Sequence, residues 1–206
     1  MSDEPRNSIS RRTLLKIAGI GATVTTTLAR LPRGILAHTP PANTPSRHPD
    51  TRRPIQSRLT EQAKLVNQLS QEQAYHFSTT PVVQIRTEHI LLALLRVPDS
   101  FGARLLVFLD MPLDRVREAV LEQVTPGLQL HGRRMQFAPD GRRAIRCAIE
   151  EANSLNDRHV GTEHYLMGLV REDSGLARRV LVKLGADLDR IRQMVMAARD
   201  GEGIPV

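Results

Sequence analysis

From about residue 60 to residue 199, hydrophobic residues recur with the spacing of amphipathic helices. One face repeats every three or four residues and is made by Leu113, Val116, Val120 and Val124. A second face of the same kind is made by Ile90, Leu91, Leu94 and Leu95. No alternation typical of a strand stands out in the sequence, so the pattern predicts an all-α fold.

Helix caps and helix breakers divide this region into eight short helices. In the first half we expect helices at residues 60–77, from 87 onward, at 102–109 and at 113–124. In the second half we expect them from 139 onward, from 162 onward, at 175–184 and at 188–198. Thr87 and Thr162 are the expected N-caps of their helices, and Gly185 is an expected C-terminal stop. Helices this short are marginal alone, so they should pack as one unit.

The chain also contains an internal repeat. Residues 87–96 align with residues 162–171 at an offset of 75, with six of ten positions identical. Residues 109–120 align with 184–195 at the same offset, again with six identities. Two separated blocks in one register indicate a duplicated unit. The repeat predicts two tandem four-helix units within residues 57–199 that pack with pseudo-twofold symmetry, at residues 57–125 and 136–199.

Residues 1–37 have the features of an export signal. Arg11 and Arg12 lie in Ser-Arg-Arg-Thr-Leu-Leu-Lys, which resembles the bacterial twin-arginine signal with Leu14 in place of Phe. The uncharged stretch 17–29 that follows is too short to span a bilayer. We therefore expect export by the twin-arginine route to the envelope or the exterior. The alternative is a cytoplasmic protein with a basic N-terminus.

Two further segments lie outside the repeats. Residues 38–56 hold five prolines and few apolar side chains, which predicts a disordered linker. Residues 200–206 form a short tail. If the leader were retained, the linker would hold the repeats away from the membrane; otherwise we expect no stable membrane span.

The positive charge does not indicate a nucleic-acid site. The formal net charge is +7, but residues 1–37 carry six basic and two acidic side chains. The rest of the chain has 23 basic and 20 acidic side chains and no basic cluster interleaved with aromatics. Phosphate affinity needs concentrated cations, so nucleic acid is not an expected partner. The single cysteine, Cys147, excludes an intrachain disulfide and is interpreted as a small buried hydrophobic residue.

Several motifs resemble one known family. Gly161-Thr162-Glu163-His164, the segment 137–139 that opens a helix, and the segment 181–188 are similar to the Clp N-terminal repeat of the ClpA and ClpC unfoldases. The resemblance covers about residues 57–199. It implies a domain that receives substrates or adaptor proteins without catalysis of its own. The phosphate-binding pattern G-x-x-x-x-G-K-[ST] is absent from the sequence, so we expect no ATPase activity, no enzyme and no cofactor.

The sequence departs from the family in the first repeat. Arg86 replaces the glycine before Thr-Glu-His, and about three extra residues, including Pro81, precede that motif. Ala138, at the start of the second repeat, stands where the family has Ser or Thr. These departures put the loop geometry of the first repeat in question.

Glu88 and Glu163 follow the expected N-caps. Their structural interpretation is that a carboxylate in the first turn complements the helix dipole. Resemblance to ClpC implies a second role, because the corresponding glutamates hold the guanidinium of phosphorylated arginine. On that basis we expect Glu163 to keep an arginine-binding pocket and Glu88 to be impaired, since Arg86 could occupy its site and a glycine there would adopt backbone angles that arginine reaches only at a cost.

Other polar residues have structural interpretations. His89 and His164 lack a third ligand at metal-binding spacing, so we expect packing histidines and no metal site. The adjacent pairs Glu150-Glu151 and Glu172-Asp173 are interpreted as solvated helix surface.

These observations favour a non-catalytic protein- or peptide-binding or adaptor module with grooves between its repeats. The first alternative is a structural accessory subunit that docks on a Clp-type protease complex, as the short plastid Clp-like proteins do. The second is an enzyme with an unrecognised site. The partner expected from the leading interpretation is a protein or peptide, arginine-phosphorylated if the ClpC-like site is functional.

Overall fold

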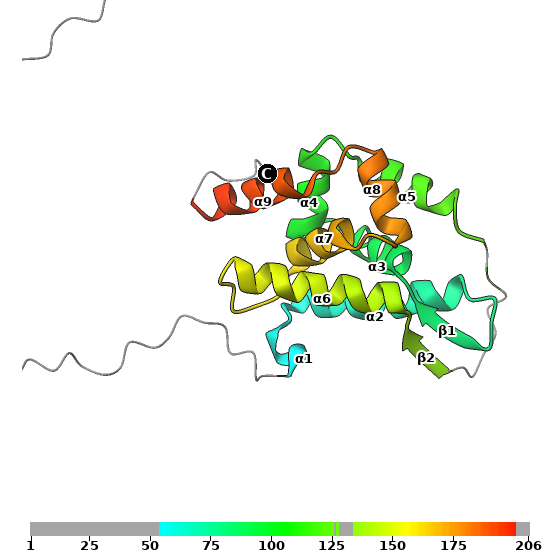
Figure 1. Cartoon of the computed structure of the whole chain (residues 1–206). Helices are drawn as coiled ribbons and strands as arrows, with labels where there is room; N and C mark the ends of the chain where they lie inside the picture. The colour runs from blue at the N-terminus through cyan, green and yellow to red at the C-terminus, as the bar shows by residue number, and fades with distance from the viewer. Residues whose placement is uncertain (1–53, 126, 128–133, 201–206) are drawn as a thin grey trace, which may run out of the picture. The chain divides into compact units, whose positions relative to one another are not determined.

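The computed structural model describes residues 54–125, 127 and 134–200, which belong to one compact unit (Figure 1). The export segment with Arg11 and Arg12, most of the linker and the end of the tail lie outside the described residues. The helices of the first repeat are α1 (Ile55–Arg58), α2 (Glu61–His76), α3 (Thr87–Leu94), α4 (Phe101–Phe108) and α5 (Leu113–Leu121). Those of the second are α6 (Pro139–Ser154), α7 (Thr162–Arg171), α8 (Leu176–Lys183) and α9 (Leu188–Arg199). The predicted all-α class is confirmed.

Several helix ends lie where the sequence predicts them. The Thr60 side chain accepts a hydrogen bond from the Ala63 amide at 3.2 Å and caps α2. Pro139 occupies the first turn of α6, where a missing N–H costs nothing. Gly185, with φ of +102°, ends α8 in a conformation that favours glycine. Among the described residues, no helix is long and apolar enough to cross a membrane.

The first helix begins within the segment expected to be linker. Ile55 opens α1, and Arg58 at its end is buried. The Arg58 Nη2 donates to Asn153 Oδ1 of α6 at 2.8 Å. This contact ties the start of the first repeat to the second repeat.

The expectation that Thr87 and Thr162 cap their own helices is wrong. The N-cap positions are Arg86 and Gly161, and each threonine is the first residue of its helix. The Thr162 hydroxyl instead accepts from the Gly102 amide of α4 at 3.0 Å. The Thr87 hydroxyl accepts from the amide of Ala177, at the equivalent place in α8, at 3.4 Å. A threonine of each repeat therefore accepts a hydrogen bond from the first turn of α4 or α8 in the other repeat.

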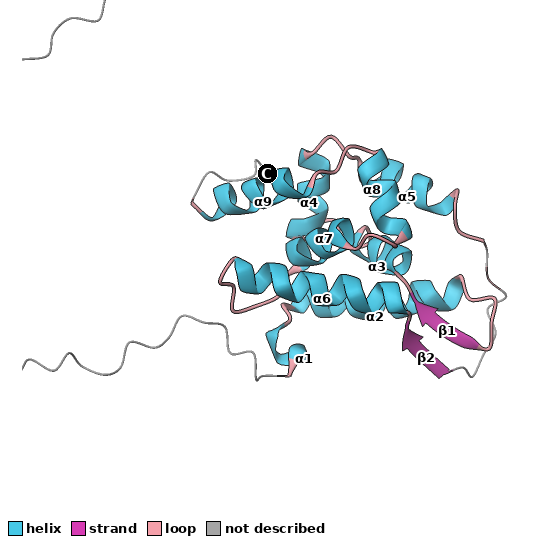
Figure 2. Ribbon diagram, viewed as in Figure 1, coloured by secondary structure: helices cyan, strands magenta, loops and turns pink. Residues whose placement is uncertain are grey.

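The described residues include two short strands that the sequence did not predict. β1 (Val82–Ile85) and β2 (Arg134–Phe137) pair in parallel, with Val82 opposite Arg134 and Ile85 opposite Phe137 (Figure 2). Four residues are too few for an alternating pattern to be recognised. The expectation of no strands is corrected at this place only.

An isolated β-bridge repeats the parallel pairing of β1 and β2 elsewhere in the unit. Leu59 pairs in parallel with Val160. The Thr60 amide donates to the Val160 carbonyl at 3.1 Å, as the Ala138 amide donates to the Ile85 carbonyl at 2.9 Å. In both places the residues just before α2 or α6 of one repeat meet the residues just before α7 or α3 of the other. This arrangement has the pseudo-twofold relation that the repeat predicts.

The centre of the unit is formed by α3 and α7, the equivalent helices of the two repeats. Every residue of α3 is buried, and in α7 all but Glu163 and Arg171 are. Helix α2 packs on α3 and α6 packs on α7 within each repeat, while α4 packs on α7 and α3 on α8 across the repeats. A helix buried all round needs neighbours on every side, so neither repeat has a complete core alone.

Two carboxylates expected on the surface are buried instead. Glu151 is 1% exposed and accepts from Arg192 Nη2 at 2.6 Å and from Arg171 Nη1 at 3.2 Å, which joins α6, α9 and α7. Glu172 is also buried and accepts from Arg143 Nε at 2.8 Å. Their neighbours Glu150 and Asp173 are exposed, as expected.

Candidate functional site

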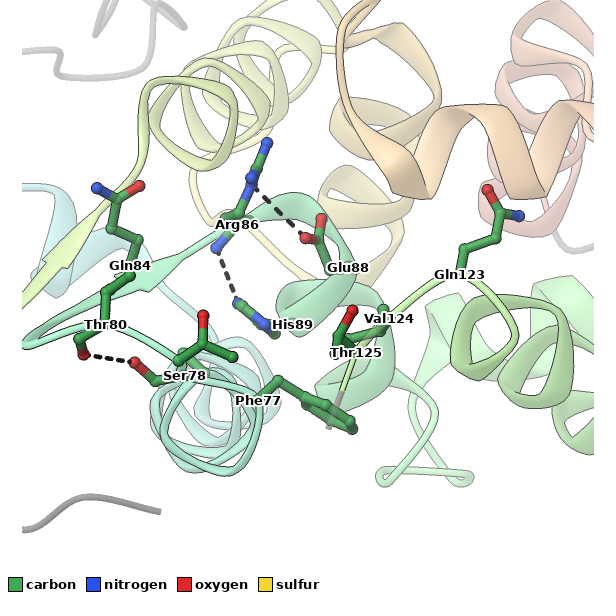
Figure 3. Close-up of a pocket in the computed structure, with 12 residues that line it drawn as sticks. Phe77, Ser78, Thr80, Gln84, Arg86, Glu88, His89, Gln123, Val124 and Thr125 are labelled. Atoms are coloured by element: carbon green, nitrogen blue, oxygen red, sulfur yellow. Dashed lines mark hydrogen bonds and ion pairs between the residues drawn. The ribbon is translucent and has the colours of Figure 1, made fainter. Parts of the chain in front are cut away.

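A cavity of about 300 Å³ lies beside Glu88 in the first repeat (Figure 3). Its walls come from the end of α2 and the segment after it, from β1, from the start of α3 and from the segment after α5. The lining side chains include the aromatic ring of Phe77 and the polar groups of Gln84, Arg86, His89 and Gln123. The cavity is therefore mostly polar.

The Arg86 guanidinium lies beside the Glu88 carboxylate. Its Nε lies 3.6 Å from Glu88 Oε1 and 3.3 Å from Asp140 Oδ2 of α6. The Arg86 side chain is 54% exposed, whereas the Glu88 side chain is only 10% exposed. Burial raises the pKa of Glu88, and the charge of Arg86 opposes this shift. The first repeat thus supplies its own guanidinium to Glu88.

The two histidines fix the backbone where α3 and α7 begin. His89 Nδ1 accepts from the Arg86 amide at 3.1 Å, and His164 Nδ1 accepts from the Gly161 amide at 3.0 Å. The His89 ring also stacks on Phe77, with ring centroids 6.1 Å apart. Burial and then the charge of Arg86 lower the pKa of His89 to about 4, so this ring is neutral near pH 7.

In the second repeat the glutamate has a different setting. Glu163 lies over Gly161, where a Cβ atom would come within 2.3 Å of Glu163 Oε1. Arg86 and Gly161 nevertheless have similar extended backbones, with φ of −109° and −99°. The expectation that arginine at position 86 reaches its backbone angles only at a cost is therefore wrong. The glycine provides space for the carboxylate, and the Glu163 side chain is 20% exposed.

Asp157, Glu163 and His164 bring possible metal ligands within 4.8 Å of one another. However, His164 Nδ1 already accepts a hydrogen bond from the Gly161 amide, so this lone pair is not available to a metal. The other ring nitrogen, Nε2, faces Asp157 Oδ2 at 2.8 Å, and the same carboxylate pairs with Arg199 of α9. Two of the three groups are engaged with the protein, and we assign this cluster to structure.

A second cavity, of about 180 Å³, lies between α2 and α6. We call it the inter-repeat groove; its lining residues are Ile55, Gln56, Leu59, Asn67, Phe137, Arg142, Ile145 and Tyr165. Leu59 and Phe137 are equivalent residues just before α2 and α6, so the groove lies where the repeats meet. The sequence predicted grooves between repeats but did not predict these residues. The equivalence of Leu59 and Phe137 was the signal that could have found them.

The floor of the inter-repeat groove is held by a buried hydrogen bond. Tyr165 of α7 is 2% exposed, and its hydroxyl donates to Asn67 Oδ1 at 3.0 Å. Burial raises the pKa of Tyr165 to about 12, so the hydroxyl keeps its proton. The groove is therefore a preformed apolar depression with a few fixed polar groups.

Comparison with known proteins agrees with the duplicated architecture. The family model for the Clp repeat (R) N-terminal domain matches residues 58–184 and 136–200. The chain belongs to the Clp N-terminal domain family. The resemblance drawn from the sequence is confirmed, and with it a relation to Clp-type substrate-binding domains.

Relatives of this Clp N-terminal domain protein include large chaperones. It is 37% identical over 139 residues to the chaperone protein ClpB of Oceanobacillus iheyensis. It is 35% identical over 141 residues to the ATP-dependent Clp protease ATP-binding subunit ClpC of Staphylococcus epidermidis. Each match covers 68% of this chain but only 17% of the relative.

Solved structures agree on the fold. A structure from preliminary investigations of a malarial protein secretion system has a TM-score of 0.56 at 17% identity, over 68% of this chain and 92% of that one. The N-terminal domain of the ClpV1 ATPase from E. coli has a TM-score of 0.53 at 18% identity, over 68% and 85%. At these identities the likeness concerns the fold alone.

Proposed function

We propose that this chain is a non-catalytic binding module that holds peptides or protein segments in the inter-repeat groove. The observation that carries the proposal is the preformed apolar depression between α2 and α6, whose floor is fixed by Tyr165 and Asn67. Its volume of about 180 Å³ is below that of pockets for drug-sized ligands, which span roughly 300–1,000 Å³. A single large side chain of a peptide suits this space better than a free small molecule.

The family relationship supports the same function. Clp N-terminal domains are substrate-binding domains, and this chain matches that domain in both repeats. The groove is built from both repeats at once, so the duplicated fold has to be complete before the site exists. An adaptor role, in which the bound segment is passed to another protein, is part of this proposal.

The proposal is tested with the full chain and a fluorescein-labelled peptide, Gly-Ser-Gly-Ser-Leu, by fluorescence anisotropy. Ile145 lines the groove and is partly exposed, so Ile145→Glu places a charge in the groove without a buried-core substitution. Leu65→Glu is the matched control, because Leu65 is an exposed apolar residue of α2 outside the groove lining. We expect at least a tenfold loss of affinity in Ile145→Glu and little change in Leu65→Glu. Equal affinities in all three proteins would refute the groove as the site.

A second candidate is arginine recognition at Glu163. Two observations favour Glu163 over Glu88: its side chain is twice as exposed, at 20% against 10%, and the missing Cβ atom of Gly161 gives its carboxylate the space it occupies. Glu88 already pairs with Arg86. A carboxylate accepts charge-assisted hydrogen bonds from a guanidinium, so an arginine or phosphorylated arginine is the ligand this site would take.

We also propose export by the twin-arginine route, on the strength of Arg11 and Arg12 before an uncharged stretch. Export would place the binding module in the cell envelope or outside the cell. The alternative of an accessory subunit on a Clp-type protease complex requires a cytoplasmic protein. The site of residence therefore discriminates between these two functions.

A further inference from the structure

Arg142 lies at the edge of the inter-repeat groove without a charged partner. Its side chain is exposed and lines the cavity. Other arginines near the start of α6 are engaged: Arg143 pairs with Glu172, and Arg86 pairs with Asp140. Among residues 54–125, 127 and 134–200, no ion pair or side-chain hydrogen bond involves Arg142. A guanidinium with five donors is therefore available at the groove.

The charges around the groove do not neutralise this cation. No carboxylate lines the groove within the described part of the chain. Asp140, the nearest carboxylate along α6, is held by Arg86, and Glu61 of α2 is held by Lys64 at 2.7 Å. Arg146, one turn further along α6, is exposed and adds a second positive charge. The groove margin is thus selective for a negatively charged group.

Amide groups at the groove add to this selectivity. The Asn67 Oδ1 accepts from the Tyr165 hydroxyl, which orients the Asn67 NH₂ group as a donor. Gln56 presents a second side-chain amide to the cavity. A carboxylate is acceptor-only when ionised and matches a guanidinium and an NH₂ group placed around one depression.

We infer that the inter-repeat groove takes the C-terminal residue of a protein or peptide, with its apolar side chain in the cavity and its α-carboxylate on Arg142. This inference rests on the proposed function and names its ligand class. A C-terminal residue carries its side chain and its carboxylate on the same Cα atom. A cavity for one side chain with a cation at its edge fits that arrangement better than an acidic side chain further along a peptide.

The test compares three fluorescein-labelled peptides on the full chain: Gly-Ser-Gly-Ser-Leu with a free C-terminus, the same peptide as its C-terminal amide, and Gly-Ser-Gly-Glu-Leu amide. We expect the free acid to bind about two- to fivefold more tightly than either amide, the scale of one exposed ion pair. Arg142→Gln should remove this preference. Arg104→Gln, an exposed arginine of α4 outside the groove, is the matched control and should keep it.

The other outcomes are equally decisive. Equal binding of the free acid and its amide, with binding still lost in Ile145→Glu, overturns the inference and leaves the proposed function standing. If the Glu-containing amide binds as tightly as the free acid, the assignment to a chain terminus is overturned. If both Arg142→Gln and Arg104→Gln lose the preference for the free acid over its amide, the preference comes from the net positive charge of the protein and not from Arg142. No binding of any peptide overturns the inference together with the proposed function.

Discussion

Replacing Glu151 by glutamine tests whether a buried carboxylate joins three helices. Glu151 Oε2 accepts from Arg192 Nε at 2.8 Å, Oε1 accepts from Arg192 Nη2 at 2.6 Å, and Arg171 adds a third bond at 3.2 Å. Removing one partner of a buried ion pair costs about 3–5 kcal/mol. Both arginines keep more than a third of their side chains in solvent, which screens the interaction. We therefore expect Glu151→Gln to lower the free energy of unfolding by about 2–3 kcal/mol.

The assay is urea unfolding of the full chain near pH 7, followed by circular dichroism. Glu150→Gln is the matched control, because Glu150 is the next residue, is 47% exposed in its side chain and pairs only with Arg171 among the described residues. That exposed pair should contribute less than about 1 kcal/mol. If Glu151→Gln and Glu150→Gln lower the free energy of unfolding by the same small amount, Glu151 is the solvated residue that the sequence suggested. The assignment of a buried ion pair is then refuted.

The stability difference between wild type and Glu151→Gln should also depend on pH. Burial would raise the pKa of Glu151, but the hydrogen bonds and charges of Arg192 and Arg171 lower it overall. A depressed folded-state pKa stabilises the protein above the unfolded-state pKa, and this stabilisation is lost as the pH falls through the folded-state value. The stability difference between wild type and Glu151→Gln should therefore shrink as the pH falls below the ordinary glutamate range. A difference that grows toward acid would contradict the assignment.

Three further predictions concern other parts of the chain. Thr162→Val leaves the buried Gly102 N–H of α4 without its acceptor, so the free energy of unfolding in urea should fall by about 1–3 kcal/mol. An unchanged unfolding midpoint would contradict this hydrogen bond between the repeats. Titration with phosphoarginine should show binding that Glu163→Ala removes and Glu88→Ala does not; equal losses would remove the asymmetry, and no binding at millimolar ligand would remove the site. Replacing Arg11 and Arg12 by Lys should keep the protein in the cytoplasm in fractionation experiments, and unchanged secretion would exclude the twin-arginine route.

Local signals in the sequence were sufficient to predict most of the helical framework. Thr60, Pro139 and Gly185 act on their own helix ends, so their roles follow from neighbouring residues alone. The offset of 75 residues between the two blocks also predicted the duplicated architecture. These features depend on short stretches of chain, which periodicity and capping rules describe well.

Features that depend on distant residues were missed or misplaced. Thr162 was expected to cap its own helix because its acceptor role toward Gly102, 60 positions away, has no local sequence signal. Glu151 was expected at the surface because the arginine that covers it, Arg192, comes from a helix 41 residues later. The inter-repeat groove is lined by residues from both repeats, so its composition follows only from the packed structure.

The most direct test of the account is where a bound peptide lies. The full chain, with methyl-labelled Ile and Leu residues, is titrated with Gly-Ser-Gly-Ser-Leu carrying a spin label at its N-terminus, and methyl NMR signals are followed. We predict selective broadening of the Ile145 and Leu59 methyl groups, which line the inter-repeat groove, while the exposed methyl groups of Leu121 on α5 keep their intensity. Broadening of Leu121 with unchanged Ile145 and Leu59 signals would place the peptide elsewhere and contradict the central claim.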